Sequence, residues 1–236
     1  GTKCAGIVAA VSNNEPMVGI AHKAQLMAVR IFANGDKYAE EEQMARAIHY
    51  AVDNGARILS NSWGGPAASA LISQAIAYAQ SKDRLFVAAA GNSGRDNDCV
   101  PRIYPASYEH ENIVAVAAID EYDTLSRSSN FGRDSVDIAA PGVRIWSTTT
   151  RDEGLYVPDD GTSFAAPFVA GAAALLWSKN QRQTAAAVKR KLLKHRRQVG
   201  ALSTRCACGG TLDLGFMRKR RRKRRAAARN SRSFNR

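Results

Sequence analysis

Apolar residues along the chain follow helical and strand spacings in alternation. Residues 44–52 place apolar side chains at positions i, i+3, i+4, i+7 and i+8, which predicts a helix that ends near Gly55. Residues 71–79 repeat this spacing after a Gly-Gly-Pro break. Short β-branched runs separate the helices, and the expected strands cover residues 26–31, 57–60, 85–89, 113–116 and 136–139. This alternation favours an α/β fold of three layers, α/β/α, with a mostly parallel central sheet.

The C-terminal part of the chain adds two more helices. Residues 164–177 form an apolar run dominated by alanine, and small side chains let a helix pack closely on a sheet. We therefore expect a buried helix there, with Ser163 at its N-terminal end. A second helix is expected over residues 184–197, where cations gather toward the C-terminal end that the helix dipole favours. Residues 211–214 are expected to form a short closing segment.

The composition predicts a folded domain with a basic end. With 236 residues, 45% of them hydrophobic, the chain is long enough for one sizeable core. It has no apolar run of the ~18 residues that a membrane-spanning helix needs. The net charge of +13 comes from the C-terminal third. Residues 161–217 hold nine Lys or Arg and one acid, residues 218–236 hold eleven Lys or Arg and no acid, and residues 1–160 are net acidic. We expect a folded domain over residues 1–217 and a disordered basic tail over residues 218–236.

The cysteines and the first residues say little about the compartment. Four cysteines are too few for a disulfide framework at this length, and Cys206-x-Cys208 lacks the spacing and the second pair of a zinc site. The sequence starts at Gly1 without an initiator methionine or a signal peptide. We therefore expect it to be part of a longer protein.

Two breaks rich in glycine and asparagine, at residues 61–65 and 91–94, directly follow expected strands. In a parallel sheet such breaks gather at the carboxyl ends of the strands, where binding sites form. Taken singly, each break indicates a turn rather than a site, because glycine and asparagine tolerate positive φ at little cost.

Ser163 stands at the start of a buried helix, where a lone serine usually serves as an N-cap. Its surroundings favour a second function. A glycine turn precedes it, and Pro167 lies inside the helix, where proline costs about 3 kcal/mol, so another constraint must keep it there. A helix N-terminus offers N–H groups and partial positive charge to an oxyanion. An acyl-transfer nucleophile needs this arrangement together with a base.

Several blocks, in the expected order, resemble the subtilisin-like serine proteases, the subtilase family. The resemblance covers about residues 1–217, and its most specific part is the block around Ser163. The similar blocks are the nucleophile block at residues 161–171, the oxyanion block at 88–94, the substrate-pairing strand end at 62–65, the block after the catalytic histidine at 1–6, and two further segments at 104–108 and 139–142.

The resemblance implies a serine-type endopeptidase that acts on polypeptide substrates and needs no cofactor for its chemistry. Ser163 would be the nucleophile, and the Asn92 side chain would hold the oxyanion together with the Ser163 backbone N–H. The substrate-binding residues that it implies are Ser62, Trp63, Gly64, Ala89, Ala90 and Gly91. Of these, Gly64 and residues 89–91 should border the pocket for the substrate side chain before the cleaved bond.

The sequence departs from the family in its catalytic triad. The resemblance puts the histidine directly before Gly1 and the aspartate further upstream, so we expect the chain as given to be inactive alone. Lys3 replaces the second histidine of the usual block, and residues 36–39 replace a substrate strand that often contains glycine. The histidines present, which we interpret as structural or surface residues, are His22, His49, His110 and His195.

The remaining expectations concern calcium, partners and location. Residues 12–19 resemble in position and length a calcium-binding loop of many subtilases, with Asn13 as an oxygen ligand, and an ordinary polar loop fits them equally well. We expect a monomer, and the resemblance implies secretion. The alternative function is a noncatalytic scaffold or polyanion binder, since residues 218–225 are eight consecutive cations. Intact Ser163 and Asn92 favour the protease.

Overall fold

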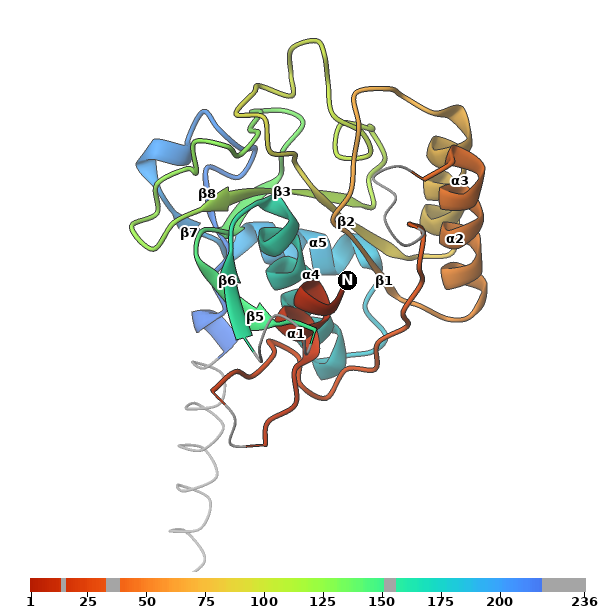
Figure 1. The fold of residues 1–236 in the computed structure, drawn as a ribbon, viewed down its shortest axis with the longest axis horizontal. Helices are drawn as coiled ribbons and strands as arrows, with labels where there is room; N and C mark the ends of the chain where they lie inside the picture. Colours follow the sequence, from red (N-terminus) through yellow and green to blue (C-terminus); the bar gives the residue numbers. More distant parts are fainter. Residues whose placement is uncertain (14–15, 33–38, 151–155, 218–236) are drawn as a thin grey trace, which may run out of the picture.

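A six-stranded sheet forms the centre of the protein (Figure 1). The structure is a computed structural model that describes residues 1–13, 16–32, 39–150 and 156–217. Neighbouring strands β1, β2, β3, β4 and β8 run parallel in that order, and β7 pairs antiparallel with β8 at the edge. The strands are β1 (Ile58–Asn61), β2 (Leu85–Ala89), β3 (Ile113–Ile119), β4 (Ile138–Pro141), β7 (Arg197–Gln198) and β8 (Gly210–Thr211).

Helices cover both faces of this sheet (Figure 1). Side chains of β2 alternate between two cores, because successive residues of a strand point to opposite faces. Leu85 and Val87 pack with the first group of helices, whereas Phe86 packs with the second. This arrangement confirms the predicted three-layer α/β/α fold. The first group is α1 (Thr2–Ala9), α4 (Thr162–Lys179) and α5 (Ala185–Lys194), and the second is α2 (Glu41–Asp53) and α3 (Ala70–Ser81).

Helix α4 lies directly on the sheet and carries Ser163 at its start. Its Ala165, Ala166 and Ala172 have no exposed surface. Gly171 lies against Ile20, where an added Cβ would stand 2.7 Å from Ile20 Cβ. These small residues let the helix approach its neighbours closely, which confirms the buried helix that the sequence predicts.

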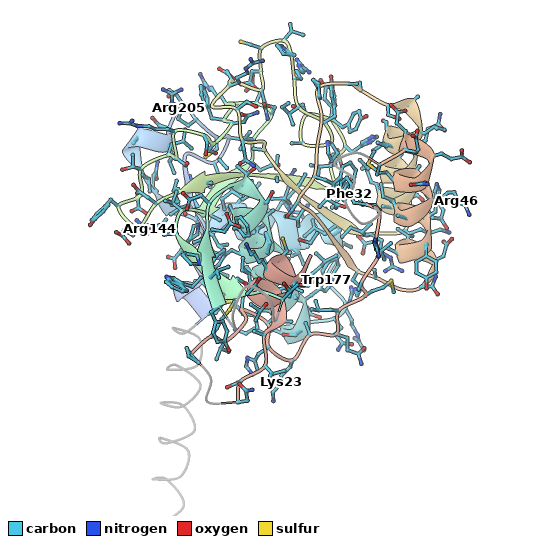
Figure 2. The ribbon with its side chains drawn as sticks, viewed as in Figure 1. Lys23, Phe32, Arg46, Arg144, Trp177 and Arg205 are labelled. Carbon is cyan, nitrogen blue, oxygen red and sulfur yellow. The ribbon has the colours of Figure 1, made fainter. Side chains whose placement is uncertain are left out.

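The prediction of a strand over residues 26–31 is wrong. No strand includes these residues, and Leu26 and Met27 are 52% and 41% exposed. A strand requires a hydrogen-bonded neighbour, and β1 is paired only with β2 in the described part of the chain. The segment instead runs beside α2, and residues 29–32 and α2 line a groove of about 530 Å³. In Figure 2 the labels of Phe32 and Arg46 mark the two sides of this groove.

Other differences are shifts of boundaries and elements that the sequence did not indicate. β4 begins at Ile138 instead of residue 136, and α5 ends at Lys194 because the chain extends into β7 three residues later. Helix α1 was not expected, and neither was the antiparallel pair β5 (Ile145–Thr148) and β6 (Tyr156–Asp159). None of the described helices is long and apolar enough to cross a membrane. The expected basic tail, residues 218–236, lies outside the described residues.

Candidate active site

Ser163 lies in the first turn of α4, two residues after Gly161. Gly161 has φ +138°, a value that side-chain-bearing residues rarely adopt, and an added Cβ would stand 3.3 Å from the amide atoms of Asn92. Glycine thus lets the chain pass Asn92 and turn into the helix. Ser163 is half-buried. Its hydroxyl and its backbone N–H lie at the positive end of the helix dipole, where the helix supplies no intrahelical acceptor.

The Asn92 side chain is fixed against the start of α4. Its Oδ1 accepts hydrogen bonds from the Thr162 backbone N–H at 2.8 Å and from Thr162 Oγ1 at 3.0 Å. Thr162 is fully buried, and its Oγ1 in turn accepts from the Gly91 N–H at 3.1 Å. These bonds occupy the oxygen of the amide. The Nδ2 group remains as a donor on an exposed residue beside Ser163.

Ser62, which follows the carboxyl end of β1, joins this strand to Ser163. Ser62 Oγ donates to the Ser163 carbonyl at 2.8 Å, Cys4 Sγ donates to the same oxygen at 3.4 Å, and Ser163 Oγ donates to the Ser62 carbonyl at 3.3 Å. Pro167 explains why that carbonyl is available. Proline has no N–H, so the oxygen four residues earlier, that of Ser163, loses its helical partner. Pro167 therefore leaves the Ser163 carbonyl for Ser62.

Helix α1 begins next to this cluster. Cys4, in its first turn, donates to the Ser163 carbonyl, so the N-terminal end of α1 lies close to Ser163. Lys3 Nζ pairs with Asp159 Oδ2 at 2.8 Å, and Ser147 Oγ donates to the Lys3 carbonyl at 2.6 Å. The hydrogen bond from Lys3 holds the pKa of Asp159 below its ordinary value. Ser147 of β5 and Asp159 of β6 thus hold the start of α1 beside the segment that leads into α4.

Comparisons with known proteins show which family the chain belongs to. A model of the subtilase family matches residues 1–209. The chain belongs to the subtilase family. Thermitase from Thermoactinomyces vulgaris is 43% identical over 182 residues, which are 77% of this chain and 62% of thermitase. Subtilisin DY from Bacillus licheniformis is 35% identical over 192 residues, or 81% of this chain and 68% of subtilisin DY. The chain thus spans only about two thirds of these relatives.

Solved structures show the same fold. The structure of the prenylagaramide maturation protease PagA superimposes with a TM-score of 0.78 at 31% identity, over 91% of this chain and 79% of PagA. The self-cleaved protease domain of PatA gives 0.78 at 30% identity, over 91% of this chain and 80% of the other. Family and fold class are therefore as the sequence predicted.

In this subtilase, Ile103 lies between the two glycines expected to border the pocket for the substrate side chain before the cleaved bond. Ile103 Cγ2 is 3.3 Å from the position of an added Cβ at Gly64 and 3.3 Å from that at Gly91. A branched side chain therefore stands between the two predicted walls. Nothing in the sequence singles out this residue. Its place depends on a distant loop, which returns to the end of β1 through the bridge between Gly65 and Tyr104.

The other residues predicted to bind substrate contribute in different ways. Ala89 and Ala90 are 5% and 0% exposed and their side chains belong to two separate cores, so only their backbone can border a pocket. Trp63 packs against the core beneath α2 and α3, whereas Gly64 is exposed. Their part in substrate binding stays a prediction.

The histidines make their contacts away from Ser163, in agreement with a structural or surface role. His22 is exposed, and burial lowers the pKa of His110. The His49 and Tyr78 rings have centroids 4.6 Å apart, and the His195 ring stacks on that of Phe216 with centroids 4.1 Å apart. His110 Nε2 is hydrogen-bonded to Ser73 Oγ at 2.9 Å.

The calcium prediction remains a prediction. Within the described ranges, no group of three or more His, Cys, Asp or Glu side chains could hold a metal ion. Asn13, the expected ligand, is described, but residues 14–15 of the same loop lie outside the described residues. Residues 36–38, expected in place of a substrate strand, lie outside them too.

Proposed function

We propose that the protein is a serine endopeptidase that cleaves peptide bonds through an acyl-enzyme on Ser163. The observation that carries this proposal is the pair of hydrogen bonds from Thr162 to Asn92 Oδ1, which fixes the Asn92 amide one residue from the nucleophile. In the proposed reaction Ser163 Oγ attacks the peptide carbonyl. Asn92 Nδ2 and the Ser163 N–H then donate to the negative oxygen, assisted by the dipole of α4.

The polypeptide substrate would bind as an additional strand beside residues 62–64. These residues follow β1, the edge strand of the described sheet, and the backbone of Gly64 is exposed. An edge of this kind pairs with an extended peptide through main-chain hydrogen bonds. The proposed chemistry uses side chains and backbone N–H groups and requires no cofactor.

The proposal needs a base to accept the Ser163 proton and return it to the leaving amine. In the described structure Ser163 Oγ donates to the Ser62 carbonyl, at a long 3.3 Å. We propose that the base is a histidine directly before Gly1, because α1 begins next to Ser163. Cys4, in the first turn of this helix, donates a hydrogen bond to the Ser163 carbonyl. It follows that Gly1–Arg236 alone should not hydrolyse peptides at an enzymatic rate.

The test compares Gly1–Arg236 with the full-length product of its gene on a chromogenic peptide anilide. We expect hydrolysis by the full-length protein only, and a drop of about 10⁶-fold in kcat for Ser163→Ala. Ser178→Ala is the matched control, since Ser178 is an exposed serine of the same helix. Rapid hydrolysis by Gly1–Arg236 would refute the position of the base. A folded full-length protein without activity would refute the proposed peptidase function.

That second outcome would favour a noncatalytic scaffold that binds polyanions. Arg190 and Lys194 are exposed cations of α5. The basic run of residues 218–225 lies outside the described residues. Elution from a heparin column at markedly lower salt after deletion of residues 218–236 would support polyanion binding. We also propose a monomer and an extracellular location, which gel filtration and fractionation of the producing cells would test.

A further inference from the structure

The loop that carries Asn92 is exposed and conformationally demanding. Residues 92–95 are exposed, and Gly91 and Gly94 have φ +111° and +65°. Such a loop does not hold its own shape, since glycine is free to adopt many other conformations. Something outside the loop must fix it if Asn92 is to act on a developing charge.

A fully buried amide, that of Asn130, lies beneath this loop. Its Oδ1 accepts hydrogen bonds from the Ser93 N–H at 2.8 Å and from the Arg95 N–H at 3.2 Å. Its backbone N–H donates to the Gly91 carbonyl at 2.8 Å. Asn130 therefore binds the loop on both sides of Asn92.

A second buried amide, that of Asn97, orients the first. Asn130 Nδ2 donates to Asn97 Oδ1 at 2.9 Å, and Asn97 Nδ2 donates to the Ala90 carbonyl at 2.8 Å. Both asparagines have no exposed surface. Each uses its oxygen as an acceptor and its nitrogen as a donor, so the orientation of both amides is fixed. An unpaired buried amide is costly, which makes this arrangement resistant to rearrangement.

The contacts at Gly91 link Asn130 to the nucleophile helix. An added Cβ at Gly91 would stand 2.6 Å from Asn130 Nδ2, so only glycine lets the loop lie this close to the amide. The Gly91 carbonyl is held by Asn130 and its N–H by Thr162, which also holds Asn92. We propose that Asn130, oriented by Asn97, is a positioning residue that sets the place of Asn92 relative to Ser163. This inference rests on the proposed peptidase function.

The decisive test is a double-mutant cycle in the full-length protein with a chromogenic peptide anilide. Asn130→Ala should lower kcat by about 10–100-fold with little change in KM, because a donor displaced by about 1 Å loses most of its effect on the transition state. In an Asn92→Ala background the same change should cost less than about 3-fold, since the group that it positions is gone. Equal losses in both backgrounds would overturn the proposal.

The matched control is Asn112→Ala. Asn112 is also a buried asparagine whose Nδ2 donates to a backbone carbonyl, that of Arg84, but it lies away from the loop. It should lose stability comparably and keep its kcat within about 3-fold. A loss of kcat as large as that of Asn130→Ala would show a general effect of unfolding and overturn the proposal.

Asn130→Asp supplies a pH readout that a purely structural role would not give. A protonated carboxyl can accept hydrogen bonds from the loop and donate one to Asn97 Oδ1, whereas a carboxylate has no proton to donate to that oxygen. Burial raises the pKa of such a carboxyl, so the ratio of variant to wild-type kcat should rise as the pH falls. A ratio independent of pH would contradict the proposed role.

Hydrogen exchange separates failure of this inference from failure of the proposed function. If full-length wild type and Ser163→Ala hydrolyse the peptide equally slowly, the peptidase proposal fails. The exchange of the Ser93 and Arg95 amides still decides whether Asn130 fixes the loop. Asn130→Ala should accelerate both amides at least 10-fold and Asn112→Ala neither, and unchanged exchange in Asn130→Ala would overturn the inference.

Discussion

Truncating Ile103 should shift the preference of the proposed protease toward larger apolar side chains before the cleaved bond. The change Ile103→Ala removes three carbon atoms, and one of them, Cγ2, lies close to both Gly64 and Gly91. Only Cγ2 is within 3.3 Å of the added Cβ positions at both glycines, so it sets the lower limit of the space released. The complete side chain sets the upper limit.

The expected magnitude follows from the apolar surface that a substrate could then bury. Each buried methylene contributes about 0.8 kcal/mol, so one carbon gives about 4-fold and three carbons, about 2.4 kcal/mol, give about 60-fold. We therefore expect the kcat/KM ratio of a phenylalanine substrate to an alanine substrate to rise between about 4-fold and 60-fold in Ile103→Ala. The gain should appear for the larger side chain only, since alanine does not reach the new space.

The assay uses two peptide anilides that differ only in the residue before the anilide, with the full-length protein. Val100→Ala is the matched control, because Val100 is a β-branched residue of the same connecting segment that is 92% exposed. It should leave the ratio within about 2-fold of wild type. An unchanged ratio in Ile103→Ala, or a shift toward alanine, would refute the assignment of Ile103 to the pocket.

Three further predictions concern the site, the ion pair and the core. Asn92→Ala should lower kcat by about 10²–10³-fold with little change in KM in steady-state kinetics. The ion pair with Lys3 lowers the pKa of Asp159, so the pair should stabilise the fold above about pH 4 and lose this contribution as the pH falls through the lowered pKa. The urea midpoint of Lys3→Met should therefore lie below that of wild type at neutral pH, and the two midpoints should converge in acid. Leu192→Ala, at a 2% exposed site, should cost about 2–5 kcal/mol in urea unfolding, whereas Leu71→Ala, at a 48% exposed site, should cost less than about 1 kcal/mol.

The sheet could be predicted from the sequence because its strands are buried on both faces. All residues of β2 and β3 are buried, and such strands appear as continuous apolar runs between helical patterns. Helices α2 and α3 follow from their apolar spacing. Helix α1 could not be predicted in this way, because it has no acidic residue in its first turn and no side-chain cap. It is held by contacts with α4 and β5, far along the chain.

The central part of the site could be predicted for a geometric reason. Ser62 and Asn92 each follow a strand of one parallel sheet, so they meet at its carboxyl edge, and α4 brings Ser163 to the same edge. Ile103 and Asn130 could not be found, because their contacts join segments that are neither strands nor helices. Their place depends on how two loops pack together, which spacing along the chain does not encode.

Pro167 shows how a violation of a local rule can mark a candidate site. Proline within a helix costs about 3 kcal/mol, part of it through the loss of the hydrogen bond to the carbonyl four residues earlier. Here that carbonyl belongs to Ser163, and the hydroxyl of Ser62 replaces the lost partner at 2.8 Å. The replacement joins α4, with its proposed nucleophile, to the strand end expected to hold the substrate. A break in helical hydrogen bonding thus becomes a contact between the two parts of the candidate site, which is where conflicts between local preference and structure are expected to occur.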